Sequence, residues 1–132
     1  MAIPSGSGSE VLRHSAINAN NNTTALVDWG GTTGTGSMRS SGNSAGVVNV
    51  PANVIITVLN IIVYSAADQT LEIKTDWAGG GTFITHLYHG VNEGDTFIFN
   101  DKIVLREGDE LVVGNTSSWA DWAVNFIYQD WT

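Results

Sequence analysis

The chain has 132 residues, a length that fits one domain with a single core, and it has no cysteine, which excludes disulfides, thiolate metal sites and a cysteine nucleophile. Its 13 acidic and five basic residues give a formal net charge of −8, and the scattered bases lack the clustering that phosphate binding needs, so nucleic acid is not an expected partner. Charged residues make up only 14% of the chain, against about 25% in an average soluble protein, which suits either a surface packed against other chains or an ordinary neutral β-protein surface.

Residues 1–10 are polar, and we expect them to form a flexible N-terminal arm of a domain that spans residues 11–132. They hold Pro4, three Ser and two Gly around the single Ile3, too little apolar surface to offset the entropy of ordering. The arm is either a mobile terminus or a segment that becomes ordered on a partner. Because a basic start and an apolar run are both missing, we expect no signal peptide.

The next elements are two short strands and a long loop. The runs "VLRHSAIN" (11–18) and "TTALVDW" (23–29) are rich in β-forming residues and flank a "NANNN" turn signal. The segment 30–46 is rich in Gly, Ser and Thr, and Met38 is its one large apolar residue. Loops longer than about 12 residues inside a compact domain are usually functional or disordered. This loop, with Met38 and Arg39, is therefore a candidate contact element.

The strongest strand signal lies at 54–64, where Val and Ile dominate after Pro51. This stretch falls far short of the ~20 residues of a membrane-spanning helix, so we expect a protein made in a cytoplasm and soluble there, with no membrane partner. Strict alternation predicts two faces, and both are apolar: Val54, Ile56, Val58, Asn60, Ile62 on one and Ile55, Thr57, Leu59, Ile61, Val63 on the other. The strand is therefore either central and covered on both sides, or its outer face meets another subunit.

The rest of the chain divides into strand-sized pieces separated by turn signals. They are 69–77, 82–90, 96–101, 102–107, 110–115 and 122–131, with a triple-glycine turn at 79–81. Strands spaced every 8–14 residues, without a convincing amphipathic helix, indicate an all-β, single-domain β-sandwich or jelly roll of about eight strands.

The tripeptide Glu-Gly-Asp occurs at 93–95 and again at 107–109, each time directly before a strand. Gly supplies a positive φ and Asp can bond its own backbone two residues on, so both copies are predicted to be tight turns. Their carboxylates would form an acidic rim if both turns lay at one end of the sandwich. A calcium site would need Glu93, Asp95, Asp101, Glu107, Asp109 and Glu110 to converge, and no calcium-loop motif is present.

The residues that would indicate an enzyme do not form a recognisable constellation. His86 and His89 lie three apart on a predicted strand, so they are expected to face opposite sides, and His14 lies in a separate strand. "GNSAG" (42–46) matches the nucleophile motif around Ser44, but a Gly/Ser-rich loop surrounds it instead of a strand and a helix. We therefore expect no enzyme, no catalytic residue, no metal and no cofactor.

Five tryptophans remain, and most tryptophans in a β-sandwich fill the core or an edge. Trp77 and Trp119 lie near turn signals and could instead be exposed, either as platforms for sugar rings or as anchors of a protein interface. Trp122 begins a well-alternating final strand.

The ends "MAIPSGSGSEVLR" and "IYQDWT", together with "VPANVIITVLNIIVYSA" and "FNDKIVLREGDELVV", resemble small structural proteins of tailed bacteriophages. The resemblance covers residues 1–17 and 47–132 and leaves the Gly/Ser-rich loop unmatched. It implies a compact jelly-roll-like sandwich that decorates or cements the capsid, usually as a homotrimer bound to the major capsid protein. No catalytic residues come with it.

Two functions follow as hypotheses. The first is a homo-oligomeric virion protein, assembled in the host cytoplasm, that stabilises the capsid through interface residues Ile3, Pro4, Met38, Arg39, Trp77 and Trp119. The second is a receptor- or carbohydrate-binding jelly roll of a tail, baseplate or fibre, with Trp77, Trp119 and Trp122 as stacking surfaces.

Overall fold

The computed structural model describes residues 9–19, 23–30, 38–40 and 47–131. These residues form ten strands and one short 3-10 turn, η1, and they contain no α-helix. The elements are β1 (Ser9–Ala19), β2 (Thr23–Val27), β3 (Met38–Ser40), β4 (Val54–Ser65), β5 (Gln69–Asp76), η1 (Trp77–Gly79), β6 (Phe83–Val91), β7 (Thr96–Phe99), β8 (Ile103–Leu105), β9 (Glu110–Asn115) and β10 (Ala120–Asp130). The predicted all-β fold is confirmed.

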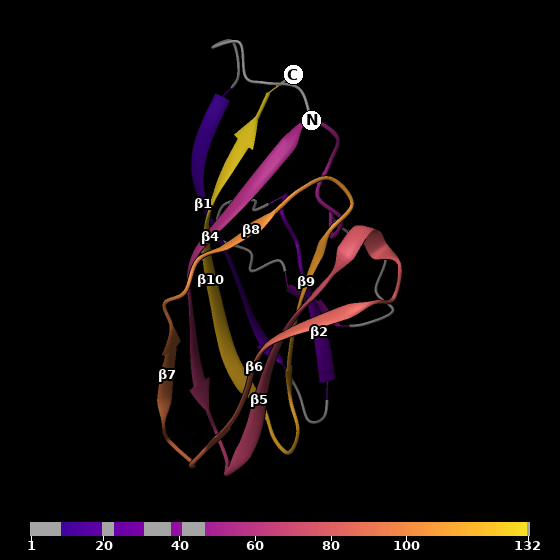
Figure 1. The fold of residues 1–132 in the computed structure, drawn as a ribbon. Helices are drawn as coiled ribbons and strands as arrows, with labels where there is room; N and C mark the ends of the chain where they lie inside the picture. Colours follow the sequence, from indigo (N-terminus) through magenta and orange to yellow (C-terminus); the bar gives the residue numbers. More distant parts are fainter. Residues whose placement is uncertain (1–8, 20–22, 31–37, 41–46, 132) are drawn as a thin grey trace.

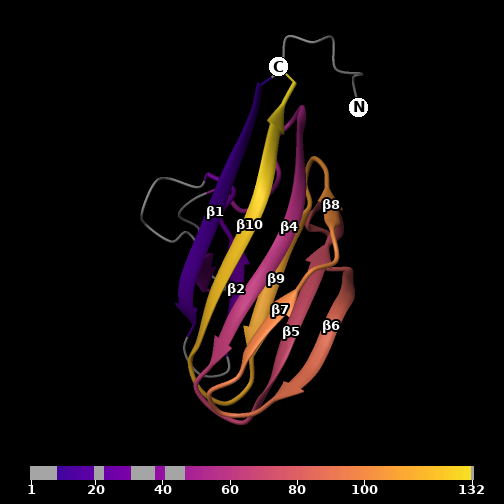
Figure 2. The ribbon, with the colours of Figure 1, turned by 90° about the vertical axis from the view of Figure 1, so that its left-hand side faces the viewer.

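The strands form two antiparallel sheets that pack face to face (Figures 1 and 2). The first sheet has the order β1-β10-β4-β7, with β8 also paired to β4, and the second has the order β3-β2-β9-β5-β6. Strands β7 and β8 pair with successive parts of β4, so they occupy one strand position, and β3 is a three-residue addition at an edge. What remains is eight strand positions with the first and last long strands adjacent, which is a jelly roll.

Strand β4 is confirmed, but its two predicted faces are wrong beyond Val58. The pairing with β10 shifts by one residue, because Asn125 lies opposite Asn60 while Phe126 lies opposite Val58, which leaves Leu59 as an extra residue. Such a β-bulge reverses the side-chain alternation that follows it. As a result Ile61 and Val63 point into the core, whereas Ile62 is exposed on the outside.

The core lies between the sheets and includes two tryptophans whose ring N–H groups both have acceptors. Trp29 packs edge-on against Phe126, with ring centroids 5.0 Å apart, and donates to the Val48 carbonyl at 2.9 Å. Trp122 donates to Asn115 Oδ1 at 3.2 Å. Because these polar groups are satisfied, both indoles can be buried at little cost.

The two Glu-Gly-Asp segments are tight turns, as predicted. Gly94 and Gly108 have φ values of 84° and 87°, a region that only glycine enters without strain. In each turn the Asp N–H donates to the carbonyl three residues earlier, at 3.0 Å in both copies. The predicted direction of the aspartate side chain was wrong, because Oδ2 accepts from the N–H three residues earlier, at 2.9 Å in the first turn and 3.1 Å in the second.

Each turn holds one end of β4 by the same pair of backbone hydrogen bonds. Ser65, the last residue of β4, accepts from the Gly94 N–H at 2.8 Å and donates to the Asp95 carbonyl at 2.9 Å. Val50, four residues before β4, accepts from the Gly108 N–H at 2.9 Å and donates to the Asp109 carbonyl at 3.0 Å. The turns therefore lie at opposite ends of the sandwich, so their carboxylates do not form the acidic rim. The Glu-Gly-Asp tripeptide recurs because the same turn is used once at each end of β4.

Two predicted segments fall largely outside the described residues. Strand β1 begins at Ser9, two residues before the expected domain start, and Ile3 and Pro4 are not among the described residues. The predicted loop 30–46 contains strand β3, which pairs with β2. The prediction of a loop was therefore wrong for residues 38–40. This pairing was missed because backbone hydrogen bonds at a sheet edge require no apolar side chain. The side chains of Met38 and Arg39 and the segment 42–46 with Ser44 lie outside the described part.

Candidate interaction face

The outer face of the first sheet carries several exposed apolar side chains. β10 buries Trp122, Val124 and Phe126, so the residues between them face away from the core, and the strand register places the outward residues of β1, β4, β7 and β8 beside them. We call this surface the outer face. Its apolar members are Leu12, Ala16, Ile55, Ile62, Tyr64, Ile98, Val104, Ala123 and Ile127, and its polar members are Glu10, His14, Thr57, Asn60, Thr96, Asp121, Asn125 and Gln129.

Several apolar side chains on the outer face are unusually exposed. Leu12 is 76% exposed, Val104 66% and Ile98 54%. Exposed apolar residues scattered singly are ordinary, but a contiguous set on one sheet marks an interaction surface. The acidic residues of the outer face are Glu10 and Asp121, near its opposite ends, although the chain carries 13 acids.

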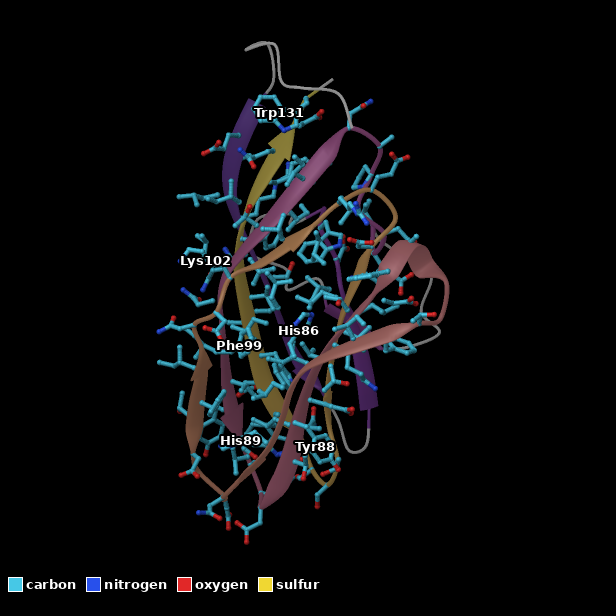
Figure 3. All side chains as sticks on the ribbon, in the orientation of Figure 1. His86, Tyr88, His89, Phe99, Lys102 and Trp131 are labelled. Atoms are coloured by element: carbon cyan, nitrogen blue, oxygen red, sulfur yellow. The ribbon has the colours of Figure 1, made fainter. Side chains whose placement is uncertain are left out.

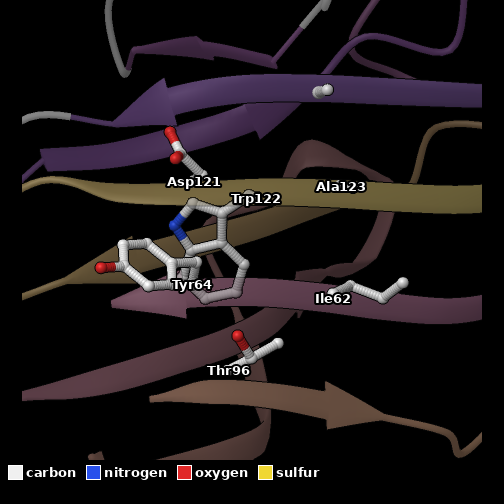
Figure 4. Close-up of a pocket in the computed structure, with 7 residues that line it drawn as sticks. Ile62, Tyr64, Thr96, Asp121, Trp122 and Ala123 are labelled. Carbon is white, nitrogen blue, oxygen red and sulfur yellow. The ribbon is translucent and has the colours of Figure 1, made fainter. Parts of the chain in front are cut away.

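A shallow groove of about 580 Å³ crosses the outer face (Figure 4). Its origin is the register, because Ala16 and Ala123 lie opposite each other and their small side chains leave a hollow beside Ile62. Tyr64, Thr96 and Asp121 also line it. Trp119 lies against the Tyr64 ring, with centroids 5.8 Å apart and planes inclined by 38°. The groove is thus mainly apolar, with the Tyr64 ring and a few polar groups in its lining.

A polar seam divides the outer face near its centre. Asn125 Nδ2 donates to Asn60 Oδ1 at 2.7 Å, and His14 lies opposite Asn125 on the neighbouring strand. The nearby Arg13 does not add charge to this face, because its guanidinium donates to the Trp29 carbonyl at 3.0 Å and lies 4.0 Å from the centre of the Tyr128 ring. The face therefore has a defined polar centre within apolar surroundings.

The structure separates the tryptophans that sequence reasoning grouped as stacking surfaces. Trp77 is exposed in η1, directly after the end of β5, whereas the Ser117 and Ser118 N–H groups before Trp119 donate to Gln69 Oε1 at the start of β5. The eight residues of β5 span about 26 Å, so these two indoles cannot contact one sugar ring. Trp122 is 1% exposed, so its predicted role as a stacking surface is wrong. Its side chain points into the core, and the adjacent Asp121 and Ala123 are the residues of β10 that face outward.

The histidines also lie differently from the prediction. A β-bulge in the pairing of β5 with β6 makes His86 an extra residue, and its Nε2 lies 2.9 Å from Oγ1 of the inward-facing Thr75. His89 lies opposite the buried Leu71, and its ring centroid is 4.7 Å from that of Phe97. Figure 3 shows His86 and His89 at different heights along the sandwich. Both histidines are therefore on the inner side of β6, and the predicted opposite orientation was wrong because of the bulge. Partial burial lowers the pKa of His86 from its ordinary 6.5.

Polar chemistry elsewhere is used to hold turns in place. Asp109 is 5% exposed and accepts from the Ala78 N–H at 2.9 Å as well as from the Arg106 N–H. Among the described residues, no group of three or more His, Asp or Glu side chains lies close enough to hold a metal ion. No helix within the described ranges is long and apolar enough to cross a membrane.

The sequence predicted only part of the outer face. The two apolar faces of 54–64 raised the possibility of a subunit contact, but Leu12, Ile98 and Val104 were not singled out. Ile98 and Val104 lie in strands of four and three residues, and Leu12 lies near the start of the long edge strand β1. Which side of each strand faces outward depends on the neighbour that it pairs with, so their joint surface could be recognised only from the sheet order.

No known protein family and no curated protein matches the chain. Among solved structures, the globular domain of zebrafish complement 1qA protein is 14% identical, with 94% of this chain and 95% of that chain covered and a TM-score of 0.44. The N-terminal cellulose-binding domain of Cellulomonas fimi β-1,4-glucanase C is 9% identical, with 99% and 98% covered and a TM-score of 0.39. A chain of infectious bursal disease virus, Gx strain, is 12% identical, with 92% and 38% covered and a TM-score of 0.40. These likenesses concern the β-sandwich fold alone.

Proposed function

We propose that the protein is a structural protein of a tailed-bacteriophage virion, a capsid decoration protein that stabilises the head by binding to the major capsid protein. The observation that carries this proposal is the outer face, a largely apolar sheet surface whose two acidic residues, Glu10 and Asp121, lie near its ends. Protein interfaces are depleted of charge at their centre and rich in aromatic and apolar side chains, and this face has that composition. The resemblance to small phage structural proteins supplies the class of partner.

The rest of the molecule fits a role that depends on surface area and rigidity. Two hydrogen-bonded turns hold the ends of β4, and the core between the sheets is continuous, so the outer face is presented as a stiff surface. A preorganised surface loses less entropy on association than a flexible one. The proposal includes no catalytic step, metal or cofactor, and it places the protein on the capsid surface after assembly in the host cytoplasm.

Co-sedimentation with phage heads assembled from the major capsid protein tests this function. The full chain is compared with Ile98→Glu, which places a charge on the outer face, and with Thr85→Glu, which places the same charge opposite Lys74 on the second sheet. We expect the full chain and Thr85→Glu to saturate the heads, and Ile98→Glu to bind at least tenfold more weakly. Absence of binding by the full chain, or equal binding by Ile98→Glu, would refute the proposal.

A carbohydrate-binding module is the second candidate, favoured by Tyr64, which lines the groove with Thr96 and Asp121 and whose ring also lies against the exposed Trp119. Aromatic rings stack on sugar rings, and neighbouring polar groups can bond sugar hydroxyls. A glycan array separates the candidates. Binding that disappears in Trp119→Ala supports the carbohydrate function, and a blank array with the folded full chain removes it.

A further inference from the structure

We infer that the outer side of the second sheet binds a neutral oligosaccharide along strand β6. This inference goes beyond the proposed function, because it gives the protein a second binding site, and it uses other residues than the groove on the first sheet. The two sheets pack face to face, so their outer sides point in opposite directions. A chain bound to a capsid through its first sheet therefore presents its second sheet to the surroundings of the virion.

Two exposed aromatic rings lie on the same side of β6. Tyr88 is 71% exposed and Phe83 is 49% exposed. Tyr88 lies opposite Glu72 of β5 and Phe83 lies opposite Asp76, so four residues of β5, or about 13 Å, separate the two positions. Both β5 partners alternate with the inward-facing residues of that strand, so the two rings point away from the core.

An ion pair occupies the surface between the two rings. Lys74 Nζ lies 3.2 Å from Glu72 Oε1 and 5.1 Å from the centre of the Phe83 ring. A sugar hydroxyl both donates and accepts hydrogen bonds, and the carboxylate accepts them while the ammonium group donates them. Because the two charged side chains are partly buried and hold each other, they are oriented before a ligand arrives, which lowers the entropy cost of binding.

Glycines leave room for a ligand beside these groups. Gly90 follows Tyr88 by two positions on the same side of β6, and a Cβ placed there would meet no atom beyond its chain neighbours within 4 Å. Gly114 lies opposite Glu72 on β9, the other neighbour of β5. A ligand can thus approach the ring and the carboxylate without displacing a side chain.

The chemistry of this surface fits a neutral sugar chain. The face of an aromatic ring carries partial negative charge and attracts the partly positive C–H groups of a pyranose, whose hydroxyl groups then reach the ion pair. The net charge of −8 disfavours an anionic polymer. A cation is not favoured either, because Glu72 is paired with Lys74, and the other acids on this side of β5 and β9, Asp76 and Glu110, already accept hydrogen bonds.

Isothermal titration calorimetry of the full chain with cellohexaose, mannohexaose and chitohexaose tests the inference, with hexagalacturonate as the acidic control. We expect at least one neutral hexasaccharide to bind, and to bind at least tenfold more tightly than its disaccharide, because only the longer ligand spans both rings. Hexagalacturonate should not bind. Tyr88→Ala and Phe83→Ala should each weaken binding at least tenfold with unchanged circular dichroism, whereas Tyr88→Phe should retain it, because stacking uses the ring and not the hydroxyl.

Trp119→Ala is the matched control, because it removes an exposed aromatic ring next to the groove of the first sheet. It should bind the hexasaccharide as the parent protein does. The inference is overturned if no neutral hexasaccharide binds, or if both folded ring variants of β6 bind as the parent does. Loss of head binding in Tyr88→Ala would also overturn it, since this surface would then contact protein.

The sugar site and the proposed function fail separately. Ile98→Glu should lose head binding and keep sugar binding, and Tyr88→Ala should do the reverse. Heads that bind the full chain when no sugar does leave the proposed function and remove the sugar site. Sugar binding by a chain that binds no head leaves the sugar site and removes the proposed function.

Discussion

Replacement of Asp109 by alanine should destabilise the protein far more than replacement of Asp95, although both occupy the last position of the same turn. Asp109 is nearly buried and accepts hydrogen bonds from the Ala78 and Arg106 N–H groups, whereas Asp95 is exposed and accepts one bond from the Asn92 N–H. A hydrogen bond to a charged group contributes about 1.5–3 kcal/mol, less where water can replace the lost partner. We therefore expect losses of about 3 kcal/mol for Asp109→Ala and about 1 kcal/mol or less for Asp95→Ala.

Thermal and urea unfolding of the two variants measure this difference. For a domain of this size, about 3 kcal/mol lowers Tm by roughly 10 °C, and about 1 kcal/mol by roughly 4 °C. The denaturant slope should stay unchanged, because the surface exposed on unfolding is the same. Equal losses in the two variants would refute the reasoning, since it rests on the burial of Asp109 and its additional bond to the Ala78 N–H.

Three further predictions concern single residues. Gly108→Ala should lower the free energy of unfolding by more than Gly94→Ala. Both turns need a positive φ, but only a Cβ at Gly108 would meet a backbone atom, the Ala78 Cα at 3.1 Å. Chemical denaturation compares the two variants, and equal losses would show that the contact is relieved. Gln69→Leu should lower the free energy of unfolding by about 3 kcal/mol, because the buried Gln69 amide donates to Ser65 Oγ and accepts from the Ser117 and Ser118 N–H groups. A Tm within about 2 °C of that of the parent protein would contradict this. His86→Gln should flatten the rise of stability as the pH increases towards 6.5, because the pKa of His86 is lowered in the folded state and the unfolded chain therefore binds the proton more readily. Unchanged pH dependence in urea melts would exclude a role for His86.

The all-β fold and most strands could be predicted because they depend on local patterns. Runs of Val and Ile such as 54–64 favour extended backbone wherever they lie, and the Gly of each Glu-Gly-Asp allows the positive φ that a tight turn needs. The β-bulges at Leu59 and His86 could not be predicted, because an extra residue in one strand is defined only relative to its partner. Both errors in facing, on β4 and on β6, follow from these two residues.

The candidate site was predicted less well than the fold. Trp77 and Trp119 are both exposed, which is one of the two alternatives that the sequence left open for them, but Trp77 lies at the far end of β5. Trp122 is in the core. Exposure of an aromatic residue depends on which face of its strand the sheet order buries, and the residue type alone does not carry that information.

By itself the sequence determined the class of structure, because alternating β-branched residues and regularly spaced turns specify strands. The lack of cysteine excludes disulfides and thiolate sites, and the lack of clustered bases argues against phosphate binding. Only the tertiary structure decided that the two acidic turns hold opposite ends of β4, and that side chains from β1, β4, β7, β8 and β10 form one apolar face. The physical reason is that strand pairing is non-local. Residues far apart in the chain become neighbours through backbone hydrogen bonds that are nearly independent of side-chain identity, so the surface they share has no signature in any single stretch of sequence.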